Sequence, residues 1–228
     1  MTIRLFDLAG GDDRRFSPYC WRAKMAIAHK GLAFEAVGVP FTGIPSILGG
    51  GQKTVPVLED DGRVVADSFA IAAYLEEAYP DRPSLFGGPG GEASARFVEA
   101  WAFTALHPTL LKLLVGEIHD LLAAEDQPYF RESRASRLGQ PIEAFEDRGA
   151  ARVEELRERL APLRGMLRRQ PFIGGDAPLY HDYIVFGSLQ WQRVVSPVAV
   201  LAADDPVAEW HDRLLDLHGG LGRRAVAS

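Results

Sequence analysis

The sequence has little cysteine and no long apolar run. Among its 228 residues Cys20 is the single cysteine, which excludes an intrachain disulfide and fits a reducing compartment. No stretch of about 18 consecutive apolar residues is present to cross a bilayer. The N-terminal stretch MTIRLFDLAGGDDRRF carries charges where a signal peptide needs an apolar run. We therefore expect a cytoplasmic protein.

An excess of positive charge is also absent. The chain has 25 Lys and Arg against 31 Asp and Glu, and its net charge of −6 speaks against nucleic acid and anionic membranes as partners. No glycine-rich run leads into Lys-Ser or Lys-Thr, so no phosphate-binding loop is predicted. Three His-Asp pairs resemble metal ligands, but adjacent residues on a helix do not face one site. We expect no metal site.

The first third of the chain contains short apolar segments around one clear helix start. Residues 2–9 and 33–39 predict two strands. Between them a helix is expected to follow Ser17, because serine is a favourable N-cap and Pro18 needs no N–H at the first helical position. Gly31 is suited to end this helix. This part of the chain therefore predicts a βαβ unit.

A hairpin and a second helix come next. Two apolar runs joined by Asp61-Gly62 predict an antiparallel pair, because Asp-Gly is a strong hairpin turn. Ser68 is expected to cap the following helix, which Pro80 ends. Together with the βαβ unit, this ββα unit completes an α/β domain over residues 1–83.

The rest of the chain has helical periodicity. The stretch SLFGGPGG, residues 84–91, has four glycines and a proline and predicts a linker. Apolar residues then follow helical spacing over 92–118, and again from Val153 to Leu167, where Pro162 predicts a kink. Two more helices are expected, near 182–195 and 205–218. We thus expect an all-helical domain over residues 92–228.

A βαβ-ββα domain followed by a helical domain of this length resembles a cytosolic glutathione transferase. Four motifs carry the resemblance: SPYCWRAK at the first helix, TVPVL at the third strand, ADS before the next helix, and FIGGDAPLYHDY over 172–183. The likeness covers nearly the whole chain. It implies an α/β thioredoxin-like N-terminal domain that binds glutathione as co-substrate, an all-α C-terminal domain that binds a small hydrophobic electrophile, and a homodimer.

Two branches of that superfamily are similar to this sequence. The stretches SPYCWR, HDLLAAEDQPYFRESR and DLHGGLGR resemble the serine-type bacterial β-etherases and their fungal relatives. The block that begins with Ser17 and ends in CWR is also similar to the zeta class. The first resemblance implies attack of glutathione on an electrophilic, partly aromatic substrate, with reductive aryl-ether cleavage as its most specific form. A zeta-type cis-trans isomerase and a non-catalytic ligand-binding protein on the same fold remain alternatives.

Glutathione chemistry requires a thiolate, and Ser17 is placed to stabilise one. A free thiol with a pKa near 8.5 is only about 3% ionised at pH 7, and lowering that pKa by ~2 units takes about 2.7 kcal/mol. A helix N-terminus supplies roughly 0.3–2 kcal/mol, and a hydrogen bond to a charged group about 1.5–3. A hydroxyl at an N-cap is therefore sufficient, although Ser17 also fits plain capping. Cys20 lacks a nearby base and is interpreted as structural or weakly reactive. Tyr19 is a weaker alternative donor.

The resemblance also implies the remaining site residues. Val55 would present its backbone to glutathione before a cis Pro56. Asp67 and Ser68 would meet the γ-glutamyl group, because backbone N–H groups at a helix start and a hydroxyl suit a carboxylate. Gln52 and Lys53 would bind the glycyl carboxylate. The residues expected to contact the second substrate are Ala9, Gly10, Trp101, Phe103, His107 and Leu111.

Overall fold

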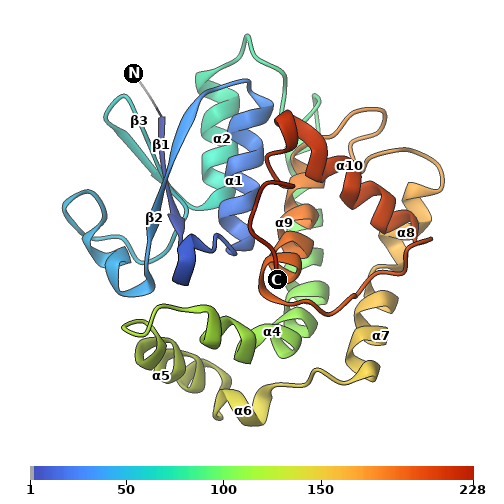
Figure 1. Cartoon of the computed structure of the whole chain (residues 1–228). Helices are drawn as coiled ribbons and strands as arrows, with labels where there is room; N and C mark the ends of the chain where they lie inside the picture. The colour runs from blue at the N-terminus through green and yellow to red at the C-terminus, as the bar shows by residue number, and fades with distance from the viewer. Residues whose placement is uncertain (1–2) are drawn as a thin grey trace.

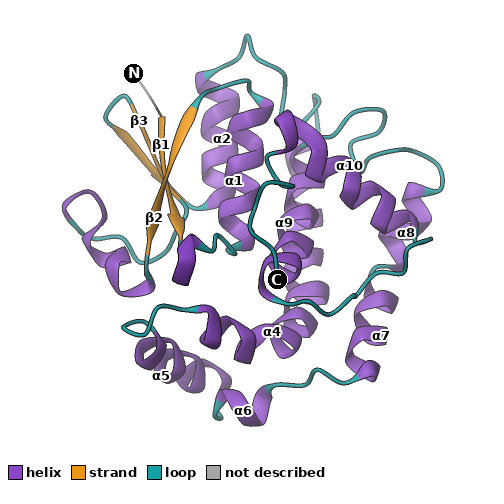
Figure 2. Cartoon of the chain, in the orientation of Figure 1, coloured by secondary structure: helices purple, strands orange, loops and turns teal. Residues whose placement is uncertain are grey.

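Four strands form one sheet at the N-terminal side of the molecule (Figures 1 and 2). The computed structural model describes residues 3–228. The strands are β1 (Ile3–Leu8), β2 (Phe34–Val39), β3 (Val57–Asp60) and β4 (Arg63–Ala66), in the order β2-β1-β3-β4. β2 is parallel to β1, whereas β3 pairs antiparallel with both β1 and β4. The predicted hairpin is confirmed, with positive φ angles at both Asp61 and Gly62 of its turn.

Two helices lie beside this sheet, α1 (Pro18–His29) and α2 (Ser68–Ala78) (Figure 1). Ser17 is the N-cap of α1, as predicted, and Pro18 occupies its first turn. Short turns of 3-10 helix, η1 (Gly11–Asp13) and η2 (Phe41–Gly49), lie in the loops after β1 and β2. The predicted βαβ-ββα arrangement is confirmed.

The remainder of the chain is helical, and the predicted fold class is confirmed. One of its helices, α9, packs along α1 of the first domain. In chain order the helices are α3 (Gly91–Trp101), α4 (His107–Leu121), α5 (Gln127–Leu138), α6 (Ile142–Phe145), α7 (Ala150–Arg159), α8 (Ala161–Leu167), α9 (Tyr180–Val195) and α10 (Pro206–Gly220).

The helical pattern predicted over 92–118 is interrupted by a π-helical segment, η3 (Ala102–Leu106), which joins α3 to α4. Hydrogen bonds in a π segment span five residues instead of four, so the residues after it are rotated relative to the α-helix before it. An apolar spacing of three and four does not reveal such a turn. Phe103 lies within this segment and His107 is the first residue of α4 after it, and both matter for the site described below.

Pro162 separates two helices instead of bending one. α7 ends before Leu160, which has φ −81° and ψ −1°, and α8 begins directly after it with Pro162 in its first turn. A proline is tolerated there because the first N–H groups of a helix have no intrahelical acceptor. The kink expected at this position is therefore a helix boundary.

α9 is buried along nearly its whole length. Gly187 lies against the carbonyl oxygen of Pro18, so that a Cβ at this position would overlap the backbone of the first turn of α1. The two helices approach this closely because Gly187 has no side chain. The start of α1, and with it Ser17, therefore rests on the backbone of α9.

The carboxylate of Asp182 fixes the start of α9. It accepts hydrogen bonds from the backbone N–H groups of Ile173, Gly174 and Leu179, at 2.7 to 3.0 Å, and from Trp210 Nε1 at 2.8 Å. Leu179 stands at the N-cap, where serine, threonine or asparagine is usual. Asp182 supplies the cap from the third helical position instead. Burial raises the pKa of Asp182, although each hydrogen bond acts in the opposite direction.

One carboxylate of the helical domain fastens the loop after β2. Asp126, at the start of α5, accepts from the backbone N–H of Phe41 at 2.6 Å and from both the N–H and the hydroxyl of Thr42, at 2.9 and 2.8 Å. On the other side of the sheet, the hydroxyl of Tyr180 donates to the carbonyl oxygen of Ser68 at 2.8 Å. The two domains are thus joined by buried hydrogen bonds as well as by apolar packing.

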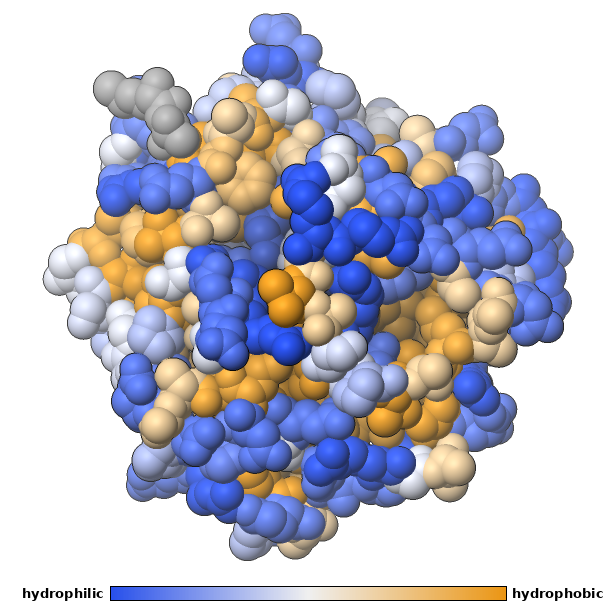
Figure 3. Space-filling view, viewed as in Figure 1, coloured by the Kyte–Doolittle hydropathy of each residue, from blue (hydrophilic) through white to orange (hydrophobic). Residues whose placement is uncertain are grey.

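On the face seen in Figure 3, polar residues are interspersed with separate apolar patches. Within residues 3–228, no helix has the length and apolar content needed to cross a membrane. The same residues hold no group of three His, Cys, Asp or Glu side chains arranged for a metal ion.

Candidate active site

Ser17 lies at the junction of the loop after η1 and α1. Its Oγ accepts a hydrogen bond from the backbone N–H of Cys20 at 3.3 Å, which is the contact of an N-cap. The side chain is 5% exposed. Because Oγ acts as an acceptor in this contact, the single hydroxyl proton is left to donate elsewhere. Capping and donation are therefore compatible at Ser17.

Cys20 is fully buried. Its side chain is 0% exposed, and burial raises the pKa of its thiol well above the usual value. The neighbouring carboxylate of Asp7 acts in the same direction. A thiol that stays protonated is neither a nucleophile nor a ligand, so Cys20 has no thiolate to contribute.

A cavity of about 550 Å³ opens between the end of the sheet and α3. It brings together five residues predicted for the site, which come from the start of β3, the turn into α2, and the π segment: Val55, Pro56, Asp67, Ser68 and Phe103. The peptide bond between Val55 and Pro56 is cis. Six further residues complete the lining: Tyr19, the alternative thiolate donor, together with Arg22, Thr54, Arg96, Glu99 and Ala100.

The prediction that Ser68 caps α2 is wrong, because Asp67 is the N-cap. Asp67 has φ 80°, and its Oδ1 accepts from the backbone N–H groups of Phe69 and Ala70, both at 2.9 Å. Ser68 is the first helical residue. Its side chain is 1% exposed, and its Oγ has no hydrogen-bond partner within residues 3–228. A buried polar atom without a partner is costly, and this one lies in the wall of the cavity.

The residues expected to hold the glycyl carboxylate lie just outside the lining. Gln52 and Lys53 precede Thr54 in the loop between η2 and β3, and Lys53 is exposed. Thr54 itself lines the cavity. The loop therefore borders the cavity, while neither of the two predicted side chains forms its wall.

Arg22 and Glu99 are cavity residues that the sequence left without a role. The Arg22 side chain is fully buried, its Nη1 lies 3.2 Å from Glu99 Oε1, and its guanidinium lies 4.7 Å above the ring centroid of Tyr19. Two of its nitrogens, Nε and Nη2, have no partner among residues 3–228. Burial raises the pKa of Glu99, and the charge of Arg22 opposes this. Arg22 stands within the motif SPYCWR, but the motif does not reveal that Glu99 is its partner.

His107 lies behind the cavity and not in its wall. It is 8% exposed, with Nδ1 at 3.3 Å from the hydroxyl of Tyr19 and Nε2 at 3.0 Å from Ser188 Oγ. Phe103, four residues earlier, is 61% exposed and lines the cavity, with its ring centroid 6.2 Å from that of His107. His107 therefore contacts Tyr19 and does not line the cavity itself.

The other residues predicted for the second substrate do not line this cavity. Trp101 and Leu111 pack partly buried against the hydrophobic core, as aromatic and aliphatic residues at helical spacing commonly do. Gly10 lies against Leu121 at the end of α4, where a Cβ would meet the Leu121 side chain and carbonyl oxygen. Ala9, beside it, continues the pairing with β2 through an N–H donated to the carbonyl oxygen of Val39. The loop after β1 therefore packs against α4.

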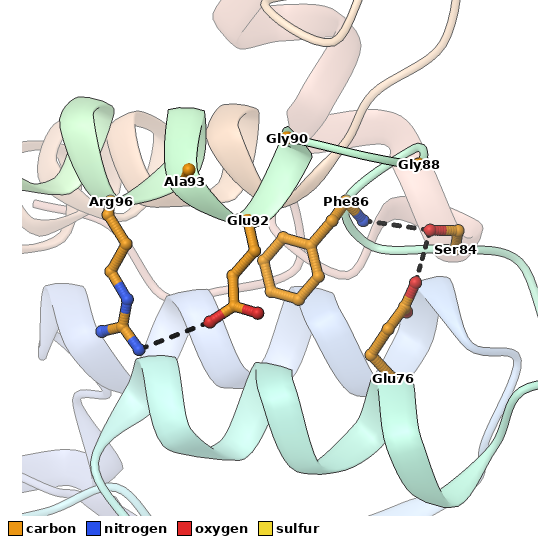
Figure 4. A pocket seen from close by; sticks show the side chains of 8 residues that line it. All are labelled: Glu76, Ser84, Phe86, Gly88, Gly90, Glu92, Ala93 and Arg96. Carbon is orange, nitrogen blue, oxygen red and sulfur yellow. Dashed lines mark hydrogen bonds and ion pairs between the residues drawn. The ribbon is translucent and has the colours of Figure 1, made fainter.

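A second cavity of about 560 Å³ lies between α2 and the start of α3 (Figure 4). Glu76 accepts from Ser84, and Ser84 accepts from the backbone N–H of Phe86, which fixes the linker along one side. Glu92 and Arg96 form an ion pair across the other. Arg96 belongs to the walls of both cavities.

Both halves of the chain match known protein families. The model described as Glutathione S-transferase, N-terminal domain, matches residues 13–83, and the model described as Glutathione S-transferase, C-terminal domain, matches residues 93–220. The second match alone spans more than half of the chain. The two families therefore account for the α/β domain and the helical domain in turn.

Individual relatives cover most of the chain at low identity. A protein named Probable glutathione S-transferase GSTU6, from Oryza sativa subsp. japonica, is 27% identical over 210 residues, which span 86% of this chain and 80% of the relative. A glutathione S-transferase of Ceriporiopsis subvermispora, solved in complex with glutathione, superposes with a TM-score of 0.82 at 23% identity over 96% of both chains. The β-etherase LigF from Sphingobium sp. strain SYK-6 has a TM-score of 0.67 at 21% identity, covering 95% of this chain and 96% of its own.

Proposed function

Since this chain belongs to the glutathione S-transferase family, we propose that it joins the glutathione thiol to an electrophilic aromatic substrate, with Ser17 as the residue that activates the thiol. The enzyme uses glutathione as co-substrate. The observation that carries the proposal is the cavity where the cis Val55–Pro56 bond, Asp67 and the unpartnered Ser68 hydroxyl meet. Glutathione carries an ammonium group, a carboxylate and a peptide backbone, which are suitable partners for Asp67, Ser68 and the backbone of Val55.

The glutathione contacts follow from the chemistry of these groups. The buried Ser68 hydroxyl and the backbone at the start of α2 suit the γ-glutamyl carboxylate. Asp67 uses one oxygen to cap α2, and its other oxygen is available to the ammonium group. The backbone of Val55 would pair with the cysteinyl residue, and Gln52 and Lys53 beside Thr54 would meet the glycyl carboxylate.

Ser17 is the better candidate than Tyr19 for the thiolate donor. The Ser17 hydroxyl proton is not used by the N-cap contact, whereas the Tyr19 hydroxyl is engaged with His107. The burial of Cys20 and the raised pKa of its thiol support Ser17 over Cys20. Donation from Ser17, together with the N-terminus of α1, supplies the roughly 2.7 kcal/mol that a ~2-unit fall in thiol pKa requires.

Aryl-ether cleavage is the reaction we propose to test first. The sulfur would form a bond to the carbon next to the ether oxygen, and the electron pair of the broken carbon–oxygen bond would leave on the phenolate. Support comes from the sequence stretches that resemble β-etherases and from the β-etherase among the structural neighbours. The exposed Phe103 provides an aromatic surface at the second-domain side of the cavity.

We also propose a cytoplasmic homodimer, divided into domains at residues 1–83 and 92–228 by the linker 84–91. Two large apolar side chains support self-association, since Phe97 on α3 is 75% exposed and Val64 on β4 is 44% exposed. A monomer mass from light scattering at micromolar concentration would overturn the dimer.

Binding and turnover together test the proposal. Calorimetry should show glutathione binding, and an electrophile panel of aryl halides, aryl ethers and a cis-enone should identify the reaction. Ser17→Ala should raise the pKa of the bound thiol by ~1–2 units and lower turnover at neutral pH roughly ten- to a hundredfold. Cys20→Ala is the matched control and should keep wild-type turnover. Loss of turnover in Cys20→Ala with retention in Ser17→Ala would reverse the assignment.

A further inference from the structure

The Tyr19 hydroxyl is part of a hydrogen-bond chain whose direction can be worked out. The chain runs from Tyr19 Oη to His107 Nδ1 at 3.3 Å, from His107 Nε2 to Ser188 Oγ at 3.0 Å, and from Ser188 Oγ to the carbonyl oxygen of Ile184 at 3.4 Å. It connects the first turn of α1 with α4 and α9. Each hydrogen bond in the chain uses one proton. Once the donor is known at one end, the donor and acceptor of every other link are determined.

The Ile184 carbonyl fixes the first proton. A carbonyl oxygen only accepts, so the Ser188 hydroxyl donates to it, as serine hydroxyls inside helices do toward the residue four positions earlier. That hydroxyl has a single proton. Ser188 Oγ must therefore accept from His107, whose Nε2 carries the hydrogen.

The burial of His107 fixes the second proton. Desolvation lowers the pKa of His107 to about 3, and the nearby positive charge of Arg22 acts in the same direction. The imidazole is therefore neutral and has one N–H, which Nε2 uses. Nδ1 is left as an acceptor, so Tyr19 donates its proton to His107, and only the lone pairs of its oxygen remain for other partners.

Tyr19 lines the cavity, and its hydroxyl end lies toward the second domain. His107, which holds that hydroxyl, packs against Phe103, the exposed aromatic residue in the same wall. The groups suited to glutathione, Val55, Asp67 and Ser68, come instead from the first domain. The Tyr19 hydroxyl therefore lies beside His107 and Phe103, at the side of the cavity that the second domain forms.

We infer that Tyr19 is a hydrogen-bond acceptor for the second substrate, and that it selects aromatic electrophiles bearing a hydroxyl group over those with a methoxy or carbonyl group in its place. A hydroxyl donates to the Tyr19 oxygen, whereas a methoxy or carbonyl oxygen would face another lone pair. His107 is the positioning residue that sets this polarity. The inference rests on the proposed transferase function.

The tautomer of His107 is a direct test that needs no activity. Long-range proton–nitrogen NMR spectra of the protein labelled with 15N-histidine should show His107 with hydrogen on Nε2, and His107→Gln assigns the signal by its loss. Hydrogen on Nδ1 would reverse the chain, turn the Tyr19 oxygen into a donor toward the cavity, and overturn the inference.

Kinetics with a matched substrate pair tests the selection. The pair consists of an aryl ether with a free phenolic hydroxyl and its O-methyl counterpart, two groups that donate electrons to the ring to similar extents. The wild type should favour the hydroxyl compound in kcat/KM by roughly three- to tenfold, the effect of one neutral hydrogen bond. Tyr19→Phe should remove this preference while leaving the dissociation constant of glutathione unchanged. Tyr129→Phe, on exposed α5 outside the cavity, should retain it.

The outcomes separate this inference from the function on which it rests. A wild type that binds no glutathione or transfers it to no electrophile overturns the proposed function. An active wild type without the hydroxyl preference overturns the role of Tyr19 alone. A Tyr19→Phe variant that loses turnover equally with both ethers and with an aryl halide would place Tyr19 at the sulfur, which also contradicts the inference.

Discussion

At the scale of single residues, Asp67 combines a structural role with a proposed binding role. Its carboxylate caps α2 through two backbone N–H groups, and the residue also lines the cavity. Substitution by alanine would remove both roles at once. A substitution that keeps the cap and removes the charge is needed to separate them.

Asp67→Asn should bind glutathione at least roughly tenfold more weakly, because a contact to a charged group contributes about 1.5–3 kcal/mol. Its free energy of unfolding should stay within about 0.5 kcal/mol of the wild type, since asparagine caps helices as well as aspartate does. Asp67→Ala should lose about 1 kcal/mol more. Calorimetry and urea unfolding measure the two quantities. Unchanged affinity in the asparagine variant would leave Asp67 with the capping role alone.

Ser68→Ala should affect the free and the liganded protein in opposite directions. The Ser68 hydroxyl is buried without a partner, so its removal should leave the stability of the free protein unchanged or slightly increased. Glutathione affinity should fall by roughly ten- to a hundredfold, because the variant lacks the hydroxyl that we propose for the γ-glutamyl carboxylate. Thermal unfolding with and without glutathione measures both effects. A large loss of stability without ligand would show that the hydroxyl has a structural partner.

The sequence predicted residues whose role is local and missed those whose partner is distant. Ser17 and Pro18 specify a helix start by themselves, and the structure has one there. Arg22 and His107 depend on Glu99 and Ser188, which are 77 and 81 positions away. Asp67 and Ser68 are adjacent and both residue types cap helices well, so the sequence alone does not decide which of the two is the N-cap.

At the scale of elements, the contact between α1 and α9 determines where the first turn of α1 lies. Gly187 allows the backbones to meet at Pro18, one residue after Ser17. No pattern along either helix indicates this contact. Periodicity identifies the buried face of a helix but not the element that packs against it. Likewise, the π segment after α3 was not predictable, because it changes the rotation of the helix without changing its composition.

Gly187→Ala should lower both stability and turnover. The added methyl would overlap the Pro18 carbonyl, and overpacking of a buried contact typically costs about 1–3 kcal/mol. Turnover should fall as well, because the shift moves the start of α1. Gly165→Ala is the matched control, since nothing lies within 4 Å of a Cβ there, and it should stabilise α8 by roughly 0.5–1 kcal/mol. Wild-type stability in Gly187→Ala would show that the helices can separate freely.

At the scale of the whole molecule, histidines make the fold sensitive to acid. Burial lowers the pKa of five of the six histidines, to about 3 for His107 and about 4 for His211 and His218, with lowered values also at His29 and His181. His29 and His218 both contact the Tyr183 hydroxyl, so they share one partner between the domains. All five are neutral in the folded protein at pH values where the unfolded chain is protonated.

The free energy of unfolding should therefore fall as the pH drops from about 6.5 toward 4. In this window the unfolded chain binds more protons, so stability rises with pH. Because some of these histidines are partly exposed, we expect unfolding near pH 5 to take up about two protons. The free energy of unfolding should then change by about 2.7 kcal/mol per pH unit. Urea unfolding at a series of pH values gives the slope. His218→Asn, which suits the positive φ of 53° at this position, should reduce it. A flat profile above pH 5 would contradict the buried, neutral state of these side chains.

The hydrogen bonds between Asp126 and the loop after β2 limit how the two domains of this protein can be exchanged with those of relatives. Three hydrogen bonds from Phe41 and Thr42 end on a carboxylate that is 1% exposed and belongs to the other domain. A chimaera that takes its helical half from a relative without an acid at this point would leave two backbone N–H groups and a hydroxyl without acceptors. The two domains therefore cannot be exchanged independently. A chimaera must keep residues 41, 42 and 126 from the same parent protein.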